Sequence, residues 1–342
     1  MRVVVTGAAG FIGSFLVERL LGAGHDVVGV DALTPYYDPA QKQENIAPYL
    51  THQRFQFLAR DLGRSELRSI LSGAEVVFHL AGQPGVRPSW ERGFRGYVEQ
   101  NVMVTQRLLE ECRHIDSLTR FVYASSSSVY GNAAGYPTHE HALPAPHSPY
   151  GVTKLAAEHL CHLYAANYGV PTTSLRYFTV YGPRQRPDMG IHRFIESALD
   201  GHPAMVFGDG EQVRDFTFVL DAVAATIRAG EATDLPPGTT VNIAGGGACT
   251  VNELLRIISQ AVGLAVDSET VSAQAGDVDK TAADISRAAQ LLGWTPHVSL
   301  RAGIAEQVHW HRHRRDVRWL AKPERMVGAQ SVDITTPQVR DK

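Results

Sequence analysis

Cysteine is scarce in this sequence, and the few cysteines are scattered. Cys112, Cys161 and Cys249 are the three among 342 residues, and none of them belongs to a C-x-x-C pair. An odd number of isolated cysteines argues against a disulfide framework and against a cysteine-based zinc site. We therefore expect free thiols, a reducing compartment such as the cytoplasm, and no bound metal.

Excess basic charge and long apolar segments are lacking as well. Lys and Arg number 32 against 35 Asp and Glu, so the net charge is −3 and offers no basic footprint for nucleic acid. No apolar run approaches the roughly 20 residues that span a bilayer, and the first residues lack the charged and apolar regions of a signal peptide. We expect neither nucleic acid nor a membrane as a partner.

What the sequence contains instead is a regular alternation of short apolar runs and amphipathic segments. Strands are predicted at Arg2–Thr6, His25–Asp31, Phe55–Ala59, Val76–Leu80, Arg120–Ser125 and Thr172–Tyr177, and helices at Phe11–Leu21, Ser65–Leu71, Tyr97–Arg113 and Tyr150–Tyr168. Apolar strands that alternate with helices are typical of a parallel sheet covered on both faces. We predict an α/β fold with a doubly wound parallel Rossmann sheet.

After about residue 180, prolines and glycines divide the chain into shorter pieces. Helices are predicted there at Ile191–Leu199, Leu220–Gly230, Val251–Val262 and Leu300–Arg314, with a strand at Thr240–Ile243. We expect residues 1–180 to form the Rossmann domain and residues 181–325 a smaller C-terminal α/β domain, partly interleaved with the first. Residues 326–342 lack periodicity, so we expect a mobile tail.

The first strand runs into a glycine-rich turn that opens a helix. Gly7, Gly10 and Gly13 are spaced as G-x-x-G-x-x-G, and bare backbone amides at a helix N-terminus suit a pyrophosphate. Asp31 ends the next strand, 18 residues after Gly13. A carboxylate there binds both adenosine ribose hydroxyls and repels a 2′-phosphate, which favours NAD over NADP. The alternative role for Asp31 is a helix N-cap.

A tyrosine and a lysine follow at helical spacing. Tyr150 and Lys154 are adjacent on one helix face, and a cation beside a phenol lowers the pKa of the phenol. The run Ser125–Ser128 ends a predicted strand at the carboxyl edge of the sheet, where ligands bind. Alone, the pair could be a surface pair and the serines a capping loop. Together they predict a general base with hydroxyl partners.

These motifs resemble those of the extended short-chain dehydrogenase/reductase family, the NAD-dependent epimerases and dehydratases. The resemblance covers about residues 1–312 and includes the glycine turn, Asp61-Leu62, His79–Gly82, the serine run with Tyr130-Gly131, Tyr150/Lys154, Arg176–Pro183 and Arg214-Asp-Phe. It implies NAD in the first domain and a nucleotide sugar in the second. It also implies that Tyr150 is the base, that Lys154 is its partner and that Ser126 contacts the sugar O4. Gly82 stands where alanine is more usual, which we take as a small change.

The resemblance assigns residues to both ligands. For the cofactor it implies Gly7, Gly10, Phe11, Ile12, Gly13, Asp31, Asp61, Leu62, Leu80, Ala81, Gly82, Gln83, Asn101, Ser125, Tyr150, Lys154 and Tyr177. For a UDP-sugar it implies Arg87, Ser126, Ser127, Ser128, Tyr150, Thr179, Arg186, Arg193, Phe207, Arg214 and Asp277. Among these, Arg214 is expected on the diphosphate and Asp277 near the uridine. It further implies a homodimer through the Tyr97–Arg113 and Tyr150–Tyr168 helices.

Serines at positions 127 and 128 reduce the number of reactions that fit this family. Sugar 4,6-dehydratases carry an acid pair where this chain has Ser127 and Ser128, and UDP-glucuronate decarboxylases carry glutamate at the position of Ser128. Neither acid is present, which favours 4-epimerisation. The hydroxyls of Ser127, Ser128 and Thr179 could form a cradle for a uronate carboxylate, with Arg87 and Arg186 as anion partners or as mere surface charges. We therefore predict UDP-glucuronate 4-epimerisation with tightly bound NAD.

Several alternatives stay open at this point. UDP-glucose or UDP-N-acetylglucosamine 4-epimerisation is the nearest, UDP-glucuronate decarboxylation follows, and a non-catalytic NAD-sensing protein is the alternative outside enzymes. The histidines between His309 and His313 are two residues apart and point to different faces of a helix, so we predict a solvated C-terminal helix rather than a zinc site. Residues 35–42 are expected to be a loop over the adenosine.

Overall fold

The computed structural model describes residues 1–320, with side chains described through residue 316. The predicted tail at 326–342 and the end of the predicted second domain lie outside these residues. Within the described part, no helix combines the length and apolarity needed to span a membrane.

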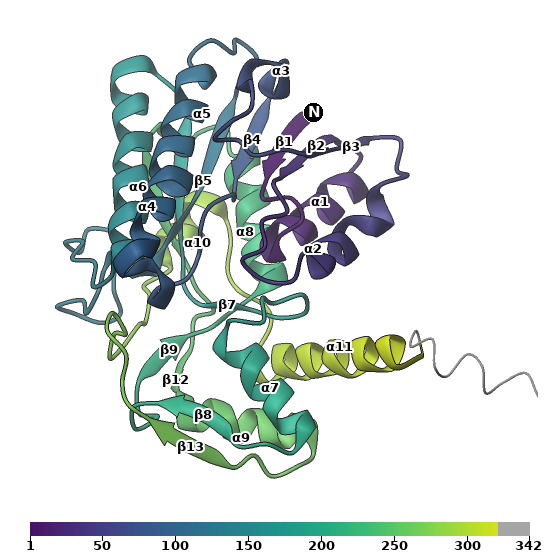
Figure 1. Cartoon of the computed structure of the whole chain (residues 1–342). Coiled ribbons are helices and arrows are strands. Elements are labelled where there is room, and N and C mark those ends of the chain that lie inside the picture. Colours follow the sequence, from purple (N-terminus) through teal and green to yellow (C-terminus); the bar gives the residue numbers. More distant parts are fainter. Residues whose placement is uncertain (321–342) are drawn as a thin grey trace, which may run out of the picture.

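A seven-stranded parallel sheet forms the centre of the molecule (Figure 1). In spatial order its strands are β11 (Thr239–Ile243), β6 (Thr172–Tyr177), β5 (Arg120–Ser126), β4 (Val76–His79), β1 (Arg2–Thr6), β2 (Asp26–Asp31) and β3 (Phe55–Ala59). The chain order changes direction between β1 and β4, and this is the point where open α/β sheets bind ligands. The predicted doubly wound sheet is confirmed.

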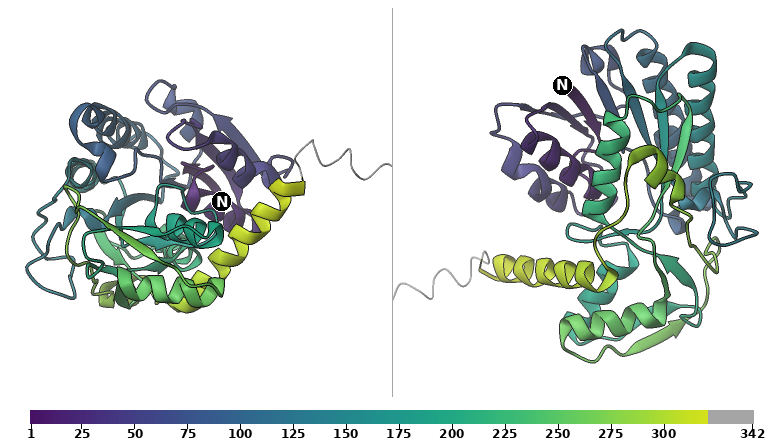
Figure 2. Two further views of the ribbon diagram at one scale, coloured as in Figure 1. Left: turned by 60° about the horizontal axis from the view of Figure 1, so that its bottom comes forward. Right: turned by 180° about the vertical axis from the view of Figure 1, so that it is seen from behind.

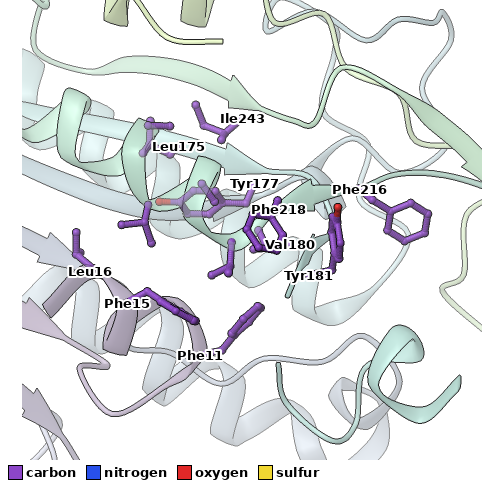
Figure 3. Close-up of a cluster of buried hydrophobic side chains, with 14 of the residues drawn as sticks. Phe11, Phe15, Leu16, Leu175, Tyr177, Val180, Tyr181, Phe216, Phe218 and Ile243 are labelled. Carbon is purple, nitrogen blue, oxygen red and sulfur yellow. The ribbon is translucent and has the colours of Figure 1, made fainter. Parts of the chain in front are cut away.

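Helices cover both faces because strand side chains alternate between them. Val3 and Val5 of β1 face the core cluster that contains α1 (Phe11–Gly22) and α8 (Val219–Glu231). Val4 faces the other cluster, built with α3 (Leu67–Leu71), α5 (Val104–Cys112) and α6 (Pro149–Tyr168). Figure 3 shows side chains of α1 meeting those of β6 and β11 in the first cluster.

The smaller part of the molecule lies beyond the carboxyl ends of the strands (Figures 1 and 2). It contains α7 (Gly190–Asp200), α9 (Val251–Val262) and α11 (Leu300–Leu320), with three two-stranded sheets: β7 (Val180–Tyr181) with β10 (Thr217–Phe218), β8 (Ala204–Phe207) with β13 (Ser268–Val271), and β9 (Val213–Asp215) with β12 (Ala248–Thr250). A capping box between Thr250 and Glu253 begins α9.

The chain crosses between the two parts more than once. After β10 it returns to the large sheet as α8 and β11, then leaves again and returns as α10 (Ser286–Leu292) beside β11. β11 pairs with β6 in parallel register from Thr239 opposite Thr173 to Ile243 opposite Tyr177. The division at residue 180 stays a prediction, but these elements belong physically to the large sheet.

Three local predictions were wrong or incomplete. Residues 35–42 are not all loop, because Asp38 caps and Pro39 begins the helix α2 (Pro39–Ile46). The predicted Tyr97–Arg113 helix is divided into α4 (Phe94–Tyr97), a π-helical turn at Val98–Met103 and α5. The C-terminal helix runs to Leu320 and is not simply solvated, because Ile304, Val308 and His311 are buried.

Candidate active site

The glycine turn between β1 and α1 leaves backbone exposed to a ligand. Gly7 has φ +71°, and a Cβ on it would lie 2.9 Å from the backbone N of Ala81. A Cβ on Gly13 would overlap the carbonyl oxygen of Gly7. Gly10 begins α1 without any side-chain cap, so the first amides of α1 are left for an anion. The turn therefore fits a pyrophosphate.

Asp31 lies at the carboxyl end of β2 and is held in place by backbone amides. Its carboxylate accepts hydrogen bonds from Ala9 N at 3.1 Å and from Leu33 N at 2.8 Å. Leu33 has φ +49°, which turns the chain around the carboxylate. The ammonium of Lys42 on α2 lies 4.0 Å from Asp31 Oδ1. Each carboxylate oxygen keeps acceptor capacity for ribose hydroxyls, so the donor set fits NAD.

A pocket runs along these strand ends. It brings together most of the predicted cofactor residues: Gly7, Gly10, Phe11, Ile12, Gly13, Asp31, Asp61, Leu62, Leu80, Ala81, Gly82 and Gln83. Tyr36, Tyr37, Lys42 and Arg60 also line it and were not predicted individually. Tyr36, Tyr37 and Lys42 belong to residues 35–42, whose expected position over the adenosine pointed toward them, and Arg60 directly precedes the Asp61-Leu62 motif.

Apart from Tyr150 and Lys154, three predicted cofactor residues lie outside this pocket, and two of them, Ser125 and Tyr177, line the adjoining cleft that contains Tyr150. Asn101 is buried behind the pocket wall, where it accepts a hydrogen bond from Gln83 N at 2.7 Å and donates to Thr153 Oγ1 at 3.0 Å. Ser125 donates its hydroxyl inward to Glu158 at 2.7 Å. Tyr177 bonds through its hydroxyl to Thr226 on α8 at 2.6 Å, and its ring lies in the core (Figure 3).

Asn101 also lies close to Gly82. A Cβ on Gly82 would lie 2.7 Å from Asn101 Oδ1, the atom that accepts the Gln83 amide hydrogen bond. Alanine at this position would therefore require Asn101 to shift. Glycine leaves room for Asn101 to hold the loop after β4, and the expectation that it is a small change stays a prediction.

The Tyr-Lys pair lies in the first turns of α6. Ser148 caps this helix by accepting from Gly151 N, and Pro149 occupies its first position, so both residues fix where Tyr150 falls. Burial raises the pKa of Tyr150, while a hydrogen bond with Ser126 and the positive charge of Arg186 lower it in part. Ser126 and Tyr150 line one pocket, as the sequence predicted.

Lys154 lines the same cleft as Tyr150, and its predicted role as the partner of the tyrosine stays a prediction. Its ammonium donates to the carbonyl oxygen of Ala124 at 2.8 Å, at the end of β5. Burial lowers the pKa of Lys154 to about 8. The charge that lowers the Tyr150 pKa in this structure comes from Arg186, which sequence reasoning placed only on the substrate. Arg186 is in turn held by Asp188 through hydrogen bonds of 2.9 and 3.0 Å.

The residues predicted for the sugar nucleotide all line connected pockets next to Tyr150. A large cleft contains Arg87, Ser126, Ser127, Ser128, Tyr150, Thr179, Arg186, Arg193 and Asp277. A second pocket adds Phe207 and Arg214 and shares Arg87, Thr179, Arg193 and Asp277 with the cleft. Side chains from both parts of the molecule therefore surround one continuous space.

Cationic side chains gather around Phe207 in the second pocket. The guanidinium of Arg87 lies 3.7 Å from the ring centroid of Phe207, and that of Arg193 lies 5.8 Å from it. Arg87 also pairs with Asp277 at 3.1 Å. Burial lowers the pKa of Arg214 from its usual value. This density of arginine suits a diphosphate, and it places Arg87 with the nucleotide end of the pocket.

Hydroxyl groups line the same continuous space as the arginines. Ser127, Ser128 and Thr179 share a small pocket with Arg214 and Asp277. The Ser126 hydroxyl accepts from the backbone N of Ser128 at 3.1 Å, so the turn after β5 is fixed by its own side chain. The hydroxyls can donate to a carboxylate without adding a second acid.

The prediction of a solvated C-terminal helix is wrong at His311, which lies beside His192. His311 on α11 is 1% exposed, its ring centroid lies 4.4 Å from that of His192, and it pairs with Glu196 of α7. The donor atoms of His192, Glu196 and His311 lie within 4.8 Å of one another, a spacing that a metal ion could use. Both oxygens of Glu196 are already paired, one with His311 and one with Arg315. We interpret the group as a clamp between α7 and α11.

Comparisons with known proteins agree with this geometry. The chain belongs to the NAD dependent epimerase/dehydratase family, whose model matches residues 3–244. It is 44% identical over 312 residues to the uncharacterized UDP-glucose epimerase YtcB of Bacillus subtilis (strain 168), covering 90% of this chain and 97% of the relative. It is 37% identical over 315 residues to a UDP-glucuronate 4-epimerase of Thermodesulfobacterium geofontis, covering 90% and 95%.

A solved structure gives the same result for the fold. The UDP-glucuronic acid 4-epimerase from Bacillus cereus, crystallised with UDP-glucuronic acid and NAD, superposes with a TM-score of 0.89 at 42% identity. The similarity covers 92% of this chain and 100% of that chain. Relatives named for glucose and for glucuronate thus match at comparable identity, so the C6 group of the substrate must be argued from the pocket.

Proposed function

We propose that this protein is an NAD-dependent UDP-glucuronate 4-epimerase, which interconverts UDP-glucuronate and UDP-galacturonate. The observation that carries the proposal is the set of hydroxyls at Ser127, Ser128 and Thr179 beside Ser126 and Tyr150, without an acid among them. A glycine turn and Asp31 suited to NAD lie at the adjoining pocket. When bound, NAD supplies the hydride chemistry, accepting the hydride of C4 and returning it.

The residues of this chain handle the proton and the orientation of the sugar. Tyr150 takes the O4 proton as the C4–H bond is broken, and it returns that proton after the 4-keto sugar has turned over. Ser126 hydrogen-bonds Tyr150, and Arg186 favours the phenolate form. Arg193 and Arg214 hold the diphosphate, which leaves the sugar free to rotate about the bonds to it. Each turnover restores the cofactor.

The hydroxyl cradle also protects the intermediate. A 4-keto uronate is a β-keto acid and loses carbon dioxide when its carboxylate bond aligns with the ketone π-system. Neutral donors from Ser127, Ser128 and Thr179 hold the carboxylate near the plane of the ketone, where that alignment is poor. An acid at this position would instead repel the carboxylate and displace it. The proposed cradle thus favours epimerisation over decarboxylation.

The testing experiment mixes the purified protein, without added NAD, with UDP-glucuronate and resolves the products by anion exchange and proton NMR. We expect UDP-galacturonate to accumulate to an equilibrium ratio. Formation of a UDP-pentose with carbon dioxide would assign the decarboxylase instead. Turnover of UDP-glucose but not of UDP-glucuronate would favour the function for which the 44% identical relative is named.

We also propose that the protein is a homodimer that forms through α4, α5 and α6. Apolar side chains on these helices and on the π-helical turn before α5, among them Met103, Val152, Leu163 and Tyr168, are exposed in the single chain. Light scattering should give twice the chain mass, and Leu163→Glu should halve it. Leu143→Glu, at an exposed loop position, is the matched control and should leave the mass unchanged. A monomeric unmodified protein would refute the proposal.

A cytoplasmic location is the final part of the proposal. The three cysteines are free thiols, and two of them are buried, which fits a reducing compartment. Fractionation of cells producing the protein should place the epimerase activity with the cytoplasmic markers.

A further inference from the structure

The loop between β7 and α7, residues 182–188, carries Arg186, which lines the same cleft as Tyr150, and the loop is held from several sides. Arg184 has φ +63° and pairs with Glu18 of α1 at 2.9 Å, with its guanidinium 4.1 Å from the Phe15 ring centroid. This contact ties the loop to the helix that receives the pyrophosphate. The loop thus lies between the cofactor part and the sugar part.

Gln185 is the centre of a buried hydrogen-bond network within this loop. Its side chain donates from Nε2 to Val180 O at 3.1 Å and accepts at Oε1 from His192 N at 3.0 Å. Its carbonyl oxygen accepts from His192 Nδ1 at 2.9 Å and from Gln41 Nε2 at 3.2 Å. The residue is 1% exposed, so water cannot replace these partners.

Gln307 of α11 completes the network from outside the loop. It is fully buried, accepts at Oε1 from Gly182 N at 2.9 Å and donates from Nε2 to Gln185 Oε1 at 2.9 Å. Gly182 has φ +138°, and a Cβ on it would lie 2.7 Å from Val219 Cγ1, so the backbone here cannot move toward α8. One side chain of α11 therefore holds both ends of the segment from 182 to 185.

Backbone groups at both ends of this hydrogen-bond network fix which side-chain atom donates and which accepts. The amides of Gly182 and His192 can only donate, and the carbonyl of Val180 can only accept. Gln307 must therefore present its oxygen to Gly182 and its nitrogen to Gln185. A glutamate at 307 would bring two acceptor oxygens together, and an apolar residue would leave a buried amide without a partner.

We propose that Gln307 is a positioning residue for the epimerisation: through Gln185 it fixes the loop that presents Arg186 to Tyr150. The inference rests on the proposed function. Gln307 lines none of the four pockets described above and is not a catalytic residue. Its effect on the reaction passes through the position of Arg186 and, by way of that charge, through Tyr150. The C-terminal helix thereby becomes part of the catalytic arrangement.

The first test compares Gln307→Met, which keeps the side-chain length and removes both hydrogen bonds, with Gln290→Met at an exposed position of α10. Hydrogen exchange is measured on the peptide that contains Gly182. We expect its exchange to rise about tenfold in Gln307→Met and to stay unchanged in Gln290→Met, because one buried hydrogen bond is lost. Unchanged exchange in Gln307→Met overturns the proposal, and this readout does not depend on activity.

The second test measures kcat and KM for UDP-glucuronate in Gln307→Met, in Arg186→Gln and in the double variant. We expect Gln307→Met to lower kcat about tenfold with KM within about twofold, and to lower it no further when Arg186 is already replaced. An unchanged kcat, or full additivity of the two losses, overturns the proposal. If the unmodified protein does not epimerise UDP-glucuronate while the exchange result holds, the proposed function fails and the loop anchor stands.

The glutamate variant adds a check on the hydrogen-bond direction. Gln307→Glu retains the acceptor for Gly182 and loses the donor to Gln185, so it should lower kcat at least as much as Gln307→Met. The thermal unfolding midpoints of all variants are recorded beside the kinetics. If kcat falls only in step with the unfolding midpoint, the variants are losing their fold at the assay temperature. The assay is then repeated at a temperature below the lowest midpoint. Recovery of full kcat at that temperature overturns the proposal.

Discussion

The cofactor pocket and the sugar pocket meet at Tyr150, but they are assembled from different kinds of structure. The first is lined by the ends of regular strands and by backbone at the start of α1. The second is lined by long side chains such as Arg87, Arg193 and Arg214, which come from a 3₁₀ helix, from α7 and from the short strand β9. The cofactor pocket presents backbone, and replacing its glycines would place side chains against that backbone. The sugar pocket presents side chains, which can be replaced one at a time. We expect the cofactor to be fixed and the sugar adjustable.

The largest effect should come from the residue that both pockets share. Tyr150→Phe removes the group that carries the O4 proton, so kcat should fall by about 10³-fold or more, as loss of a general base does. Turnover of UDP-glucuronate is followed by proton NMR. Tyr168→Phe, an exposed tyrosine on the same helix, is the control and should retain full activity. Substantial activity in Tyr150→Phe would remove the proposed base.

The cofactor pocket should respond strongly at its single acidic side chain on β2. Asp31→Asn loses the charge on a group that accepts from ribose hydroxyls, so NAD should bind about 10 to 100 times more weakly. The nearby Lys42 ammonium loses its counter-charge, and NADP binding should improve. Fluorescence titration of both nucleotides measures the change, with Asp26→Asn at the exposed start of the same strand as control. Equal affinities in protein and variant would refute the ribose assignment.

The sugar pocket should change its product rather than lose its ligand. Ser128→Glu places an acid in the proposed cradle, so the carboxylate should be displaced and carbon dioxide released with a UDP-pentose. We expect this by-product to rise about tenfold relative to the epimer, the size of effect that one charged hydrogen-bonding group produces. Isotope-labelled UDP-glucuronate measures the released gas. Ser272→Glu, at an exposed position, should give none, and no increase in Ser128→Glu would refute the cradle.

A smaller effect concerns the stability of the large sheet in acid. Burial lowers the pKa of His79 to about 3, between Thr6 Oγ1 at 2.8 Å and Thr105 Oγ1 at 2.9 Å. The unfolded chain binds a proton on this histidine near pH 6.5 and the folded chain does not, so the unfolding free energy falls as the pH drops from about 6.5 to 3, by about 1.4 kcal/mol per pH unit. His79→Gln should remove that part of the slope in urea unfolding series.

The acid unfolding experiment must account for a second histidine and needs a control variant. Burial also lowers the pKa of His192 to about 4, so the sugar part contributes a slope of its own above that pH. His159→Gln, an exposed position on α6, is the matched control and should leave the slope unchanged. If His79→Gln keeps the full slope, His79 is not the group that takes up the proton on unfolding.

The sequence predicted the large sheet and its ligand edge well, because the periodicity of apolar residues is local. The ends of β3 and β6 and the start of α9 fall where the pattern placed them. The glycine turn and Asp31 could be found because the chain between them is one strand, one helix and one turn. The predicted substrate residues also line one space, although this part of the prediction needed the family resemblance.

What could not be predicted depends on contacts between distant segments. Nothing near Lys154 indicated that its ammonium would donate to Ala124, nor that Arg186 would supply the charge beside Tyr150. The burial of His311 depends on α7, more than a hundred residues earlier in the chain. Helix α2 was missed because its segment is polar and begins with proline, although Asp38 before Pro39 is a typical start signal.

The return of the chain to β11 has a consequence for how the molecule is made. β6 cannot gain its second neighbour until residue 243 has been synthesised, because the strand that pairs with it follows α7, β8, β9 and α8. During synthesis the nucleotide-binding sheet therefore stays open at one edge while the sugar-binding segment is added. A fragment that ends at residue 180 would expose the β6 edge and the apolar face that α8 covers, and it should aggregate rather than bind NAD. Individual loops of the sugar pocket can therefore change during evolution. The sugar-binding part cannot be replaced as a single domain, because the chain passes through it before completing the large sheet.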